Sequence, residues 1–85
     1  MLKVKNEGNK AIIDVREQIK NGEHPRKEIV QFVKQSPCGT IFEIHLPVRA
    51  EPLLTVLSSL GMSAVINELA PDHFKILAVK LDSHS

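Results

Sequence analysis

Three histidines stand near the ends of expected secondary-structure elements, and imidazole nitrogens are common ligands of zinc. His24 comes directly before Pro25 in the stretch GEHPRKEIVQF (22–32), where a helix is expected to begin. His45 lies in an expected strand and His73 in an expected turn. No local spacing such as H-x-x-x-H links the three, so a metal site would depend on the fold to bring them together. The alternative is that they are solvated side chains without a common role.

Basic side chains offer a second kind of chemistry, the binding of an anion. Arg16, Arg26 and Arg49 can donate charge-assisted hydrogen bonds to a phosphate or carboxylate. The free N–H groups at a helix N-terminus favour an anion as well. Nearby acidic residues would instead pair with these arginines, and they are Glu23, Glu51 and Asp72. The predicted ligand-binding edge comprises Arg16, His24, Pro25, Arg26, Arg49 and Glu51.

The single cysteine, Cys38, lies in the turn Ser-Pro-Cys-Gly (36–39) and has no partner for an internal disulfide. No basic residue adjoins it and no helix is expected to begin there, so nothing in the sequence activates the thiol. We interpret Cys38 as a surface thiol, with sulfur transfer or redox chemistry as the alternative. The serines lack the context of a catalytic nucleophile and the glycines form no phosphate-binding loop. We therefore predict no enzymatic activity and no cofactor.

The composition is typical of an ordinary globular domain. The chain has 85 residues, of which 42% are hydrophobic and 25% charged, with a formal net charge of +1. The small net charge and the absence of tryptophan and tyrosine disfavour nucleic-acid binding. No apolar run approaches the roughly 20 residues that span a bilayer, and the first ten residues lack the apolar segment of a signal peptide. We expect a cytoplasmic protein without membrane contact.

The hydrophobic pattern predicts the elements that position these side chains. Short β-branched or alternating stretches predict strands at 11–15, 40–46, 62–69 and 74–81. Apolar residues at helical spacing predict helices at 25–36 and 52–60, whereas 16–24 is expected to be a polar connection. We expect a tail or short edge strand at 1–10, the single domain at 11–81 and a C-terminal tail at 82–85.

The order β-α-β-α-β-β predicts a two-layer α/β sandwich with two helices on one face of a four-stranded mixed sheet. The first three strands would run parallel, so the loops that follow them gather at one edge, where open α/β sheets usually bind ligands.

The other face of this sheet would have no helix over it. We expect it to carry Ile12, Asp14, Ile41, Glu43 and His45, joined by Leu77, Val79 and Leu81 if these share that side. A mixed apolar patch of this kind marks a contact with a protein partner or a weak homodimer. Partial cover by residues 1–10 is the alternative.

The order of short motifs resembles that of the DUF2249 domains, which have the TusA-like (SirA-like) sulfur-carrier fold. The motifs, spread over roughly 11–81, are IIDVR (12–16), HPRKEI (24–29), CGT (38–40), EPLLTVLSSLG (51–61) and APDHFKIL (70–77). In sulfur carriers of this fold the first helix begins Cys-Pro-x-Pro, and the cysteine accepts a persulfide. Here His24 stands in that position, and HLPVRAEP (45–52) replaces the family's His-Glu-Pro segment. The resemblance implies the scaffold without the carrier chemistry at that position.

These observations lead to one functional hypothesis and two alternatives. We predict a non-catalytic module that binds a small anionic ligand or a protein partner, and the resemblance implies an accessory role in redox or nitrogen-oxide metabolism of a bacterial-type cytoplasm. The first alternative is a sulfur-transfer or redox carrier that uses Cys38. The second is an RNA-binding domain, by similarity to the C-terminal domain of a translation initiation factor with the same fold.

Overall fold

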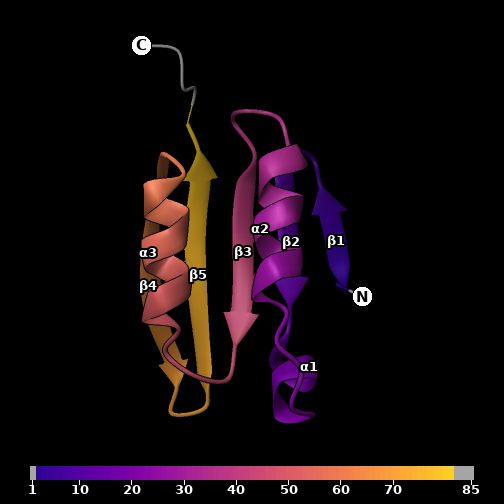
Figure 1. The fold of residues 1–85 in the computed structure, drawn as a ribbon, viewed down its shortest axis with the longest axis vertical. Helices are drawn as coiled ribbons and strands as arrows, with labels where there is room; N and C mark the ends of the chain where they lie inside the picture. The colour runs from indigo at the N-terminus through magenta and orange to yellow at the C-terminus, as the bar shows by residue number, and fades with distance from the viewer. Residues whose placement is uncertain (1, 82–85) are drawn as a thin grey trace.

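The computed structural model describes residues 2–81, which form a five-stranded sheet and three helices (Figure 1). The strands are β1 (Val4–Glu7), β2 (Lys10–Asp14), β3 (Ile41–Leu46), β4 (Met62–Ala70) and β5 (His73–Lys80). The helices are α1 (Arg16–Lys20), α2 (Arg26–Gln35) and α3 (Glu51–Ser59). Because α2 and α3 lie on the same face of the sheet, the predicted two-layer α/β sandwich is confirmed. The predicted tail at 82–85 lies outside the described residues.

The strand order across the sheet is β1-β2-β3-β5-β4. β2 and β3 pair in parallel, and β5 pairs antiparallel with both β3 and β4. The last strand therefore lies between β3 and β4, which run in the same direction without pairing. The carboxyl ends of β2, β3 and β4 all lie at one end of the sheet, near α1, as the sequence predicted (Figure 1).

Two expectations for the N-terminal part of the chain need correction. Of the tail or short edge strand expected at 1–10, the structure has the edge strand, because β1 pairs antiparallel with β2, and the sheet therefore has five strands rather than four. The stretch 16–24 is not wholly irregular, because residues 16–20 form α1. The helical pattern of α1 was missed because its five residues, REQIK, include one apolar side chain, Ile19. Ile19 packs against the core, which is why this short polar helix stays in place.

Strand alternation places one set of side chains beneath the helices. On β3, Phe42, Ile44 and Leu46 are each no more than 2% exposed. Ile44 lies between Ile13 of β2 and Ile76 of β5, at the middle of the sheet. The helices contribute Ile29, Val33, Leu53 and Leu57. Within residues 2–81 no polar or charged residue is buried as a whole, so apolar burial holds the two layers together.

Specific contacts end the helices near the predicted positions. Lys80 of β5 donates hydrogen bonds from Nζ to the carbonyl oxygens of Val33, Lys34 and Ser36, at 2.9, 3.1 and 2.6 Å. The last carbonyls of a helix lack intrahelical partners and favour a cation, so Lys80 caps α2. After α3 the chain turns at Gly61, whose φ of 84° is a left-handed conformation that glycine adopts at little cost.

The face opposite the helices is open, and the strand register confirms which residues it carries. One row across the sheet contains Ile12, Glu43, Leu77 and Val65. The neighbouring rows contain Lys10, Ile41, Val79 and Ser63 on one side and Asp14, His45, Lys75 and Asn67 on the other. β1 lies beside β2 rather than over this face, so the N-terminal residues of the strand extend the sheet and do not cover it. We call this surface the open face.

The two faces of β3 predict different costs for the same substitution. Ile44→Ala removes a fully buried side chain, and we expect a loss of about 2–5 kcal/mol in the free energy of unfolding. Ile41→Ala is the matched control on the open face, where the side chain is only partly buried, and we expect a loss of about 1 kcal/mol. Urea unfolding measures both values. If the two substitutions lowered the free energy of unfolding equally, Ile41 would be as buried as Ile44, and the open face would not be uncovered.

Candidate functional site

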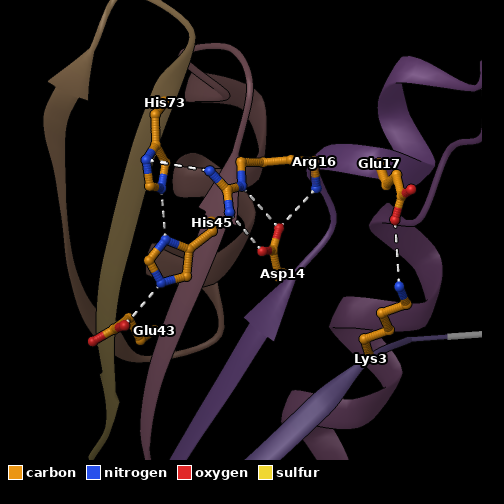
Figure 2. Close-up of polar contacts among 7 residues, drawn as sticks. All are labelled: Lys3, Asp14, Arg16, Glu17, Glu43, His45 and His73. Carbon is orange, nitrogen blue, oxygen red and sulfur yellow. Dashed lines mark hydrogen bonds and ion pairs between the residues drawn. The ribbon is translucent and has the colours of Figure 1, made fainter.

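Five side chains on and beside the open face form one continuous hydrogen-bonded network, which we call the polar chain: Glu43, His45, His73, Arg16 and Asp14 (Figure 2). His45 Nε2 lies 2.8 Å from a Glu43 carboxylate oxygen, and His45 Nδ1 lies 2.8 Å from His73 Nε2. Arg16 Nη1 lies 3.4 Å from His73 Nδ1. The same guanidinium donates to both carboxylate oxygens of Asp14, at 3.1 and 2.9 Å.

The fold brings these residues together from three elements and a helix start. Glu43 and His45 are two residues apart on β3, so both project to the same side. Parallel pairing places Asp14, the last residue of β2, beside His45. Arg16 begins α1 directly after β2, and its backbone N–H also donates to Asp14, at 3.1 Å. His73 is the first residue of β5 and reaches both Arg16 and His45.

The hydrogen-bond partners fix the tautomers of both histidines. Arg16 can only donate, so Nδ1 of His73 accepts and its Nε2 carries the proton. That Nε2–H donates to Nδ1 of His45, whose own Nε2–H then donates to the Glu43 carboxylate. Each donor between Arg16 and Glu43 thus meets an acceptor, and two neutral imidazoles connect a guanidinium to a carboxylate.

The charges along the polar chain shift the protonation of its members. The hydrogen bond from Arg16 lowers the pKa of Asp14, although partial burial opposes it. Hydrogen bonds from His45 and Lys10 lower the pKa of Glu43, and Lys10 Nζ lies 3.1 Å from that carboxylate. Partial burial, followed by the positive charge of Arg16, lowers the pKa of His73. The polar chain therefore favours ionised carboxylates at its ends and a neutral His73 between them.

The imidazoles of the polar chain have no nucleophile among the hydrogen-bond partners that the structure describes. Acyl or group transfer by a histidine needs a hydroxyl or thiol within hydrogen-bond reach of the imidazole. In the described part of the protein, no hydroxyl or thiol joins the hydrogen bonds of His45 or His73. Both ring nitrogens of each histidine are already used within the polar chain.

The structure brings together two of the three histidines of the predicted metal site. His45 and His73 are in contact, with ring centroids 5.1 Å apart. His24 instead lines a separate pocket of about 460 Å³ with Pro25 and Arg26. Among residues 2–81, no three or more His, Cys, Asp or Glu side chains are grouped so as to hold a metal ion.

The residues of the predicted ligand-binding edge lie in different parts of the structure and do not form one site. Arg16 lines a pocket of about 690 Å³ at the carboxyl end of β2, but its guanidinium is bound by Asp14. Arg49 pairs with Glu51 at 3.2 Å, and both side chains are mostly exposed. Arg26 lies in the pocket of His24, away from this group. The three arginines therefore do not converge on one anion.

Sequence reasoning missed Gln18 of α1, which lines the pocket of Arg16. Both polar atoms of its amide are buried and lack a hydrogen-bond partner in the described structure. An unsatisfied buried amide costs about 1–3 kcal/mol per group, so Gln18 marks a locally unfavourable contact beneath α1. Two ion pairs also line this pocket, Arg16 with Asp14 and Lys3 with Glu17, the latter 3.3 Å apart (Figure 2).

The reasoning also missed the roles of the two carboxylates of the polar chain. Glu43 and Asp14 were expected on the open face, but neither was linked to a histidine. The spacing Glu43-x-His45 in a strand was the available signal, because it places both side chains on one side.

Cys38 lies at the other end of the sheet, in the turn between α2 and β3, and it is exposed. It lines a pocket of about 550 Å³ with residues of the same turn and of the β1–β2 region. The predicted thiol and the polar chain are therefore separate features.

No family model matches this chain, and no curated protein matches it either. The resemblance to the DUF2249 domains thus remains a prediction from the sequence motifs. Within residues 2–81, none of the helices has the length and apolar character needed to cross a membrane.

The lowered pKa of His73 predicts a pH-dependent stability. Its ordinary value is 6.5, so the unfolded chain takes up a proton on acidification before the folded protein does. The stabilisation is complete above pH 6.5 and is lost as the pH falls through the folded pKa of His73. The lowered pKa values of Asp14 and Glu43, ordinarily 3.8 and 4.5, add a second loss at lower pH.

Urea unfolding between pH 8 and pH 5 measures the first loss. We expect His73→Gln to flatten the dependence of the unfolding free energy on pH in this range. His24→Gln is the matched control, because it removes a histidine outside the polar chain, and it should keep the wild-type slope. A wild-type slope in His73→Gln would contradict the assignment.

Proposed function

We propose that this domain is a non-catalytic protein-interaction module that binds its partner through the open face. The observation that supports the proposal is a group of apolar side chains without a covering layer, lying on both sides of Glu43 and next to the rest of the polar chain. Four of these residues are partly buried, namely Ile12, Ile41, Leu77 and Val79. Val65, next to Leu77 in the same row, is 54% exposed. Apolar patches rimmed by polar groups are typical of protein interfaces.

The energetics favour this surface over the pocket of Arg16 as the binding site. A charged ligand that binds Arg16 or Lys3 in that pocket would compete with their contacts to Asp14 and Glu17. The apolar side chains of the open face differ in this respect. Burying them releases water and does not require an ion pair of these side chains to break. Burial of apolar surface is the dominant favourable term in most protein–protein association.

Lys75 indicates the chemistry of the partner. It lies on the open face between His45 and Asn67. The other basic residues on this side of the strands are paired, as Lys5 is with Glu7 and Lys10 with Glu43. In the described contacts Lys75 has no carboxylate partner. We therefore infer a partner protein that presents apolar side chains together with a carboxylate facing Lys75.

The polar chain would fix the border of this interface before binding. A surface whose side chains are already ordered loses less conformational entropy on association than a mobile one. The sequence resemblance adds that the partner belongs to redox or nitrogen-oxide metabolism in a bacterial-type cytoplasm, and this part of the proposal rests on the motifs alone.

Photocrosslinking in cells that produce the protein tests the proposal. A benzophenone amino acid replaces Leu77 on the open face or, as a control, the exposed Gln31 on α2. We expect a defined crosslinked protein from position 77 and none from position 31. Lys75→Glu should reduce this product by about tenfold, as loss of an interfacial charge pair does, whereas Lys27→Glu on α2 should not.

Equal products from positions 77 and 31 would overturn the proposal, as would an unchanged product in the folded Lys75→Glu variant. A product made of two copies of this chain at position 77 that persists in Val65→Lys, which blocks pairing at the β4 edge, would replace the proposed partner by self-association through the open face.

A further inference from the structure

The two edges of the sheet differ in how they limit pairing with another strand. β1 at one edge has four residues and carries Lys5 and Glu7. Short length and charged side chains are the usual means of protecting an edge. β4 at the other edge has nine residues, MSAVINELA, with Glu68 as its one charge. Its outer backbone N–H and C=O groups therefore form a long, weakly protected edge.

The regular part of β4 ends at a bulge. Pairing with β5 runs without interruption from Met62 to Glu68, and the register then shifts before Ala70. A bulge distorts a strand and ends regular pairing. The segment that can accept another strand is thus the seven residues 62–68, and Val65 is its midpoint.

We infer that two copies of this chain pair through β4, antiparallel and centred on Val65, to form a continuous ten-stranded sheet. A twofold axis through Val65 uses all seven regular residues of both strands. It sets Val65 against its own copy, Ala64 against Ile66, Ser63 against Asn67 and Met62 against Glu68. The contact uses the backbone of the sheet edge rather than the open face, although Val65 borders both surfaces.

This register matches side chains that suit one another. Ala64 and Ile66, both partly buried against the core, put a small residue opposite a large one on the helix-covered side. Ser63 and Asn67 put polar opposite polar on the open side. The two copies of Glu68 lie at opposite ends of the paired segment, about 20 Å apart at about 3.4 Å per residue, so they do not repel each other.

The adjacent register is less favourable. A twofold axis at Ile66 would place Val65 opposite Asn67 and Ala64 opposite Glu68, and it would draw the bulge into the pairing. The Val65 register also continues an apolar row across the dimer. In this row Leu77 lies beside Val65 in each copy, and the two Val65 side chains lie next to each other. Val65, which is 54% exposed in the single chain, would gain the Val65 side chain of the other copy as a neighbour.

The expected dimer is weak. One pair of seven-residue strands buries less than the roughly 800 Å² per partner of a standard interface, so we expect a dissociation constant of about 10⁻⁵ M. Sedimentation velocity of the full chain from about 5 to 500 µM should therefore show a shift from monomer to dimer. Val65→Lys, a charge on the paired edge, should leave a monomer throughout this range. Leu69→Lys is the matched control, because Leu69 is similarly exposed in β4 but lies in the bulge, and it should dimerise like the wild type.

Disulfide crosslinking tests the register itself. In a Cys38→Ser background, Val65→Cys should form a covalent dimer at least about tenfold faster than Ser63→Cys, because only position 65 faces its own copy. An equal mixture of Ser63→Cys and Asn67→Cys should form the mixed dimer in preference to either homodimer.

Three results would overturn the inference: a monomer at all concentrations, a dimer that persists in Val65→Lys, or faster self-crosslinking at position 63 than at 65. Circular dichroism of each variant verifies that the substitution at this exposed edge leaves the fold intact. Loss of the crosslink from position 77 would not affect these results, so the two proposals fail separately.

Discussion

The register of β3 between β2 and β5 is the constraint on which both faces of the sheet depend. It places Ile44 between Ile13 and Ile76 under the helices, and it places His45 beside Asp14 and Lys75 on the open face. A slip of one residue would exchange the two sets, burying a histidine and a carboxylate in an aliphatic core. The cost of burying those groups without partners holds the register, and with it both the core and the polar chain.

Much of the fold could be predicted from the sequence because its strongest signals are local. The alternation of TIFEIHL, the stripe of leucines after Pro52 and the glycine at position 61 each determine an element by themselves. α1 and β1 could not be predicted with the same force, since their polar segments are held by contacts with β2 and the core. The position of β5 between β3 and β4 likewise depends on tertiary packing and not on a local sequence pattern.

The location of the site could be predicted from the sequence, but the hydrogen bonds between its side chains could not. Parallel strands bring their following loops to one end of the sheet, so the meeting of Arg16, His45 and His73 follows from topology. Which carboxylate each contacts depends on the strand register and on the turn at Arg16, which no local pattern specifies. His24 shared the predicted edge with them, yet the length of the α1–α2 connection carries it to a different pocket. The resulting surface is ordered and internally paired through Glu43 and His45, with apolar side chains on either side of them.

The central claim is that the polar chain is a fixed structure in solution, with one tautomer at each histidine. Long-range ¹H–¹⁵N NMR of the imidazole rings at pH 8 tests it most directly, because protonated and unprotonated ring nitrogens have distinct shifts. We expect the Nε2–H tautomer for both His45 and His73. Averaged tautomers, or an Nδ1–H form at either residue, would contradict it.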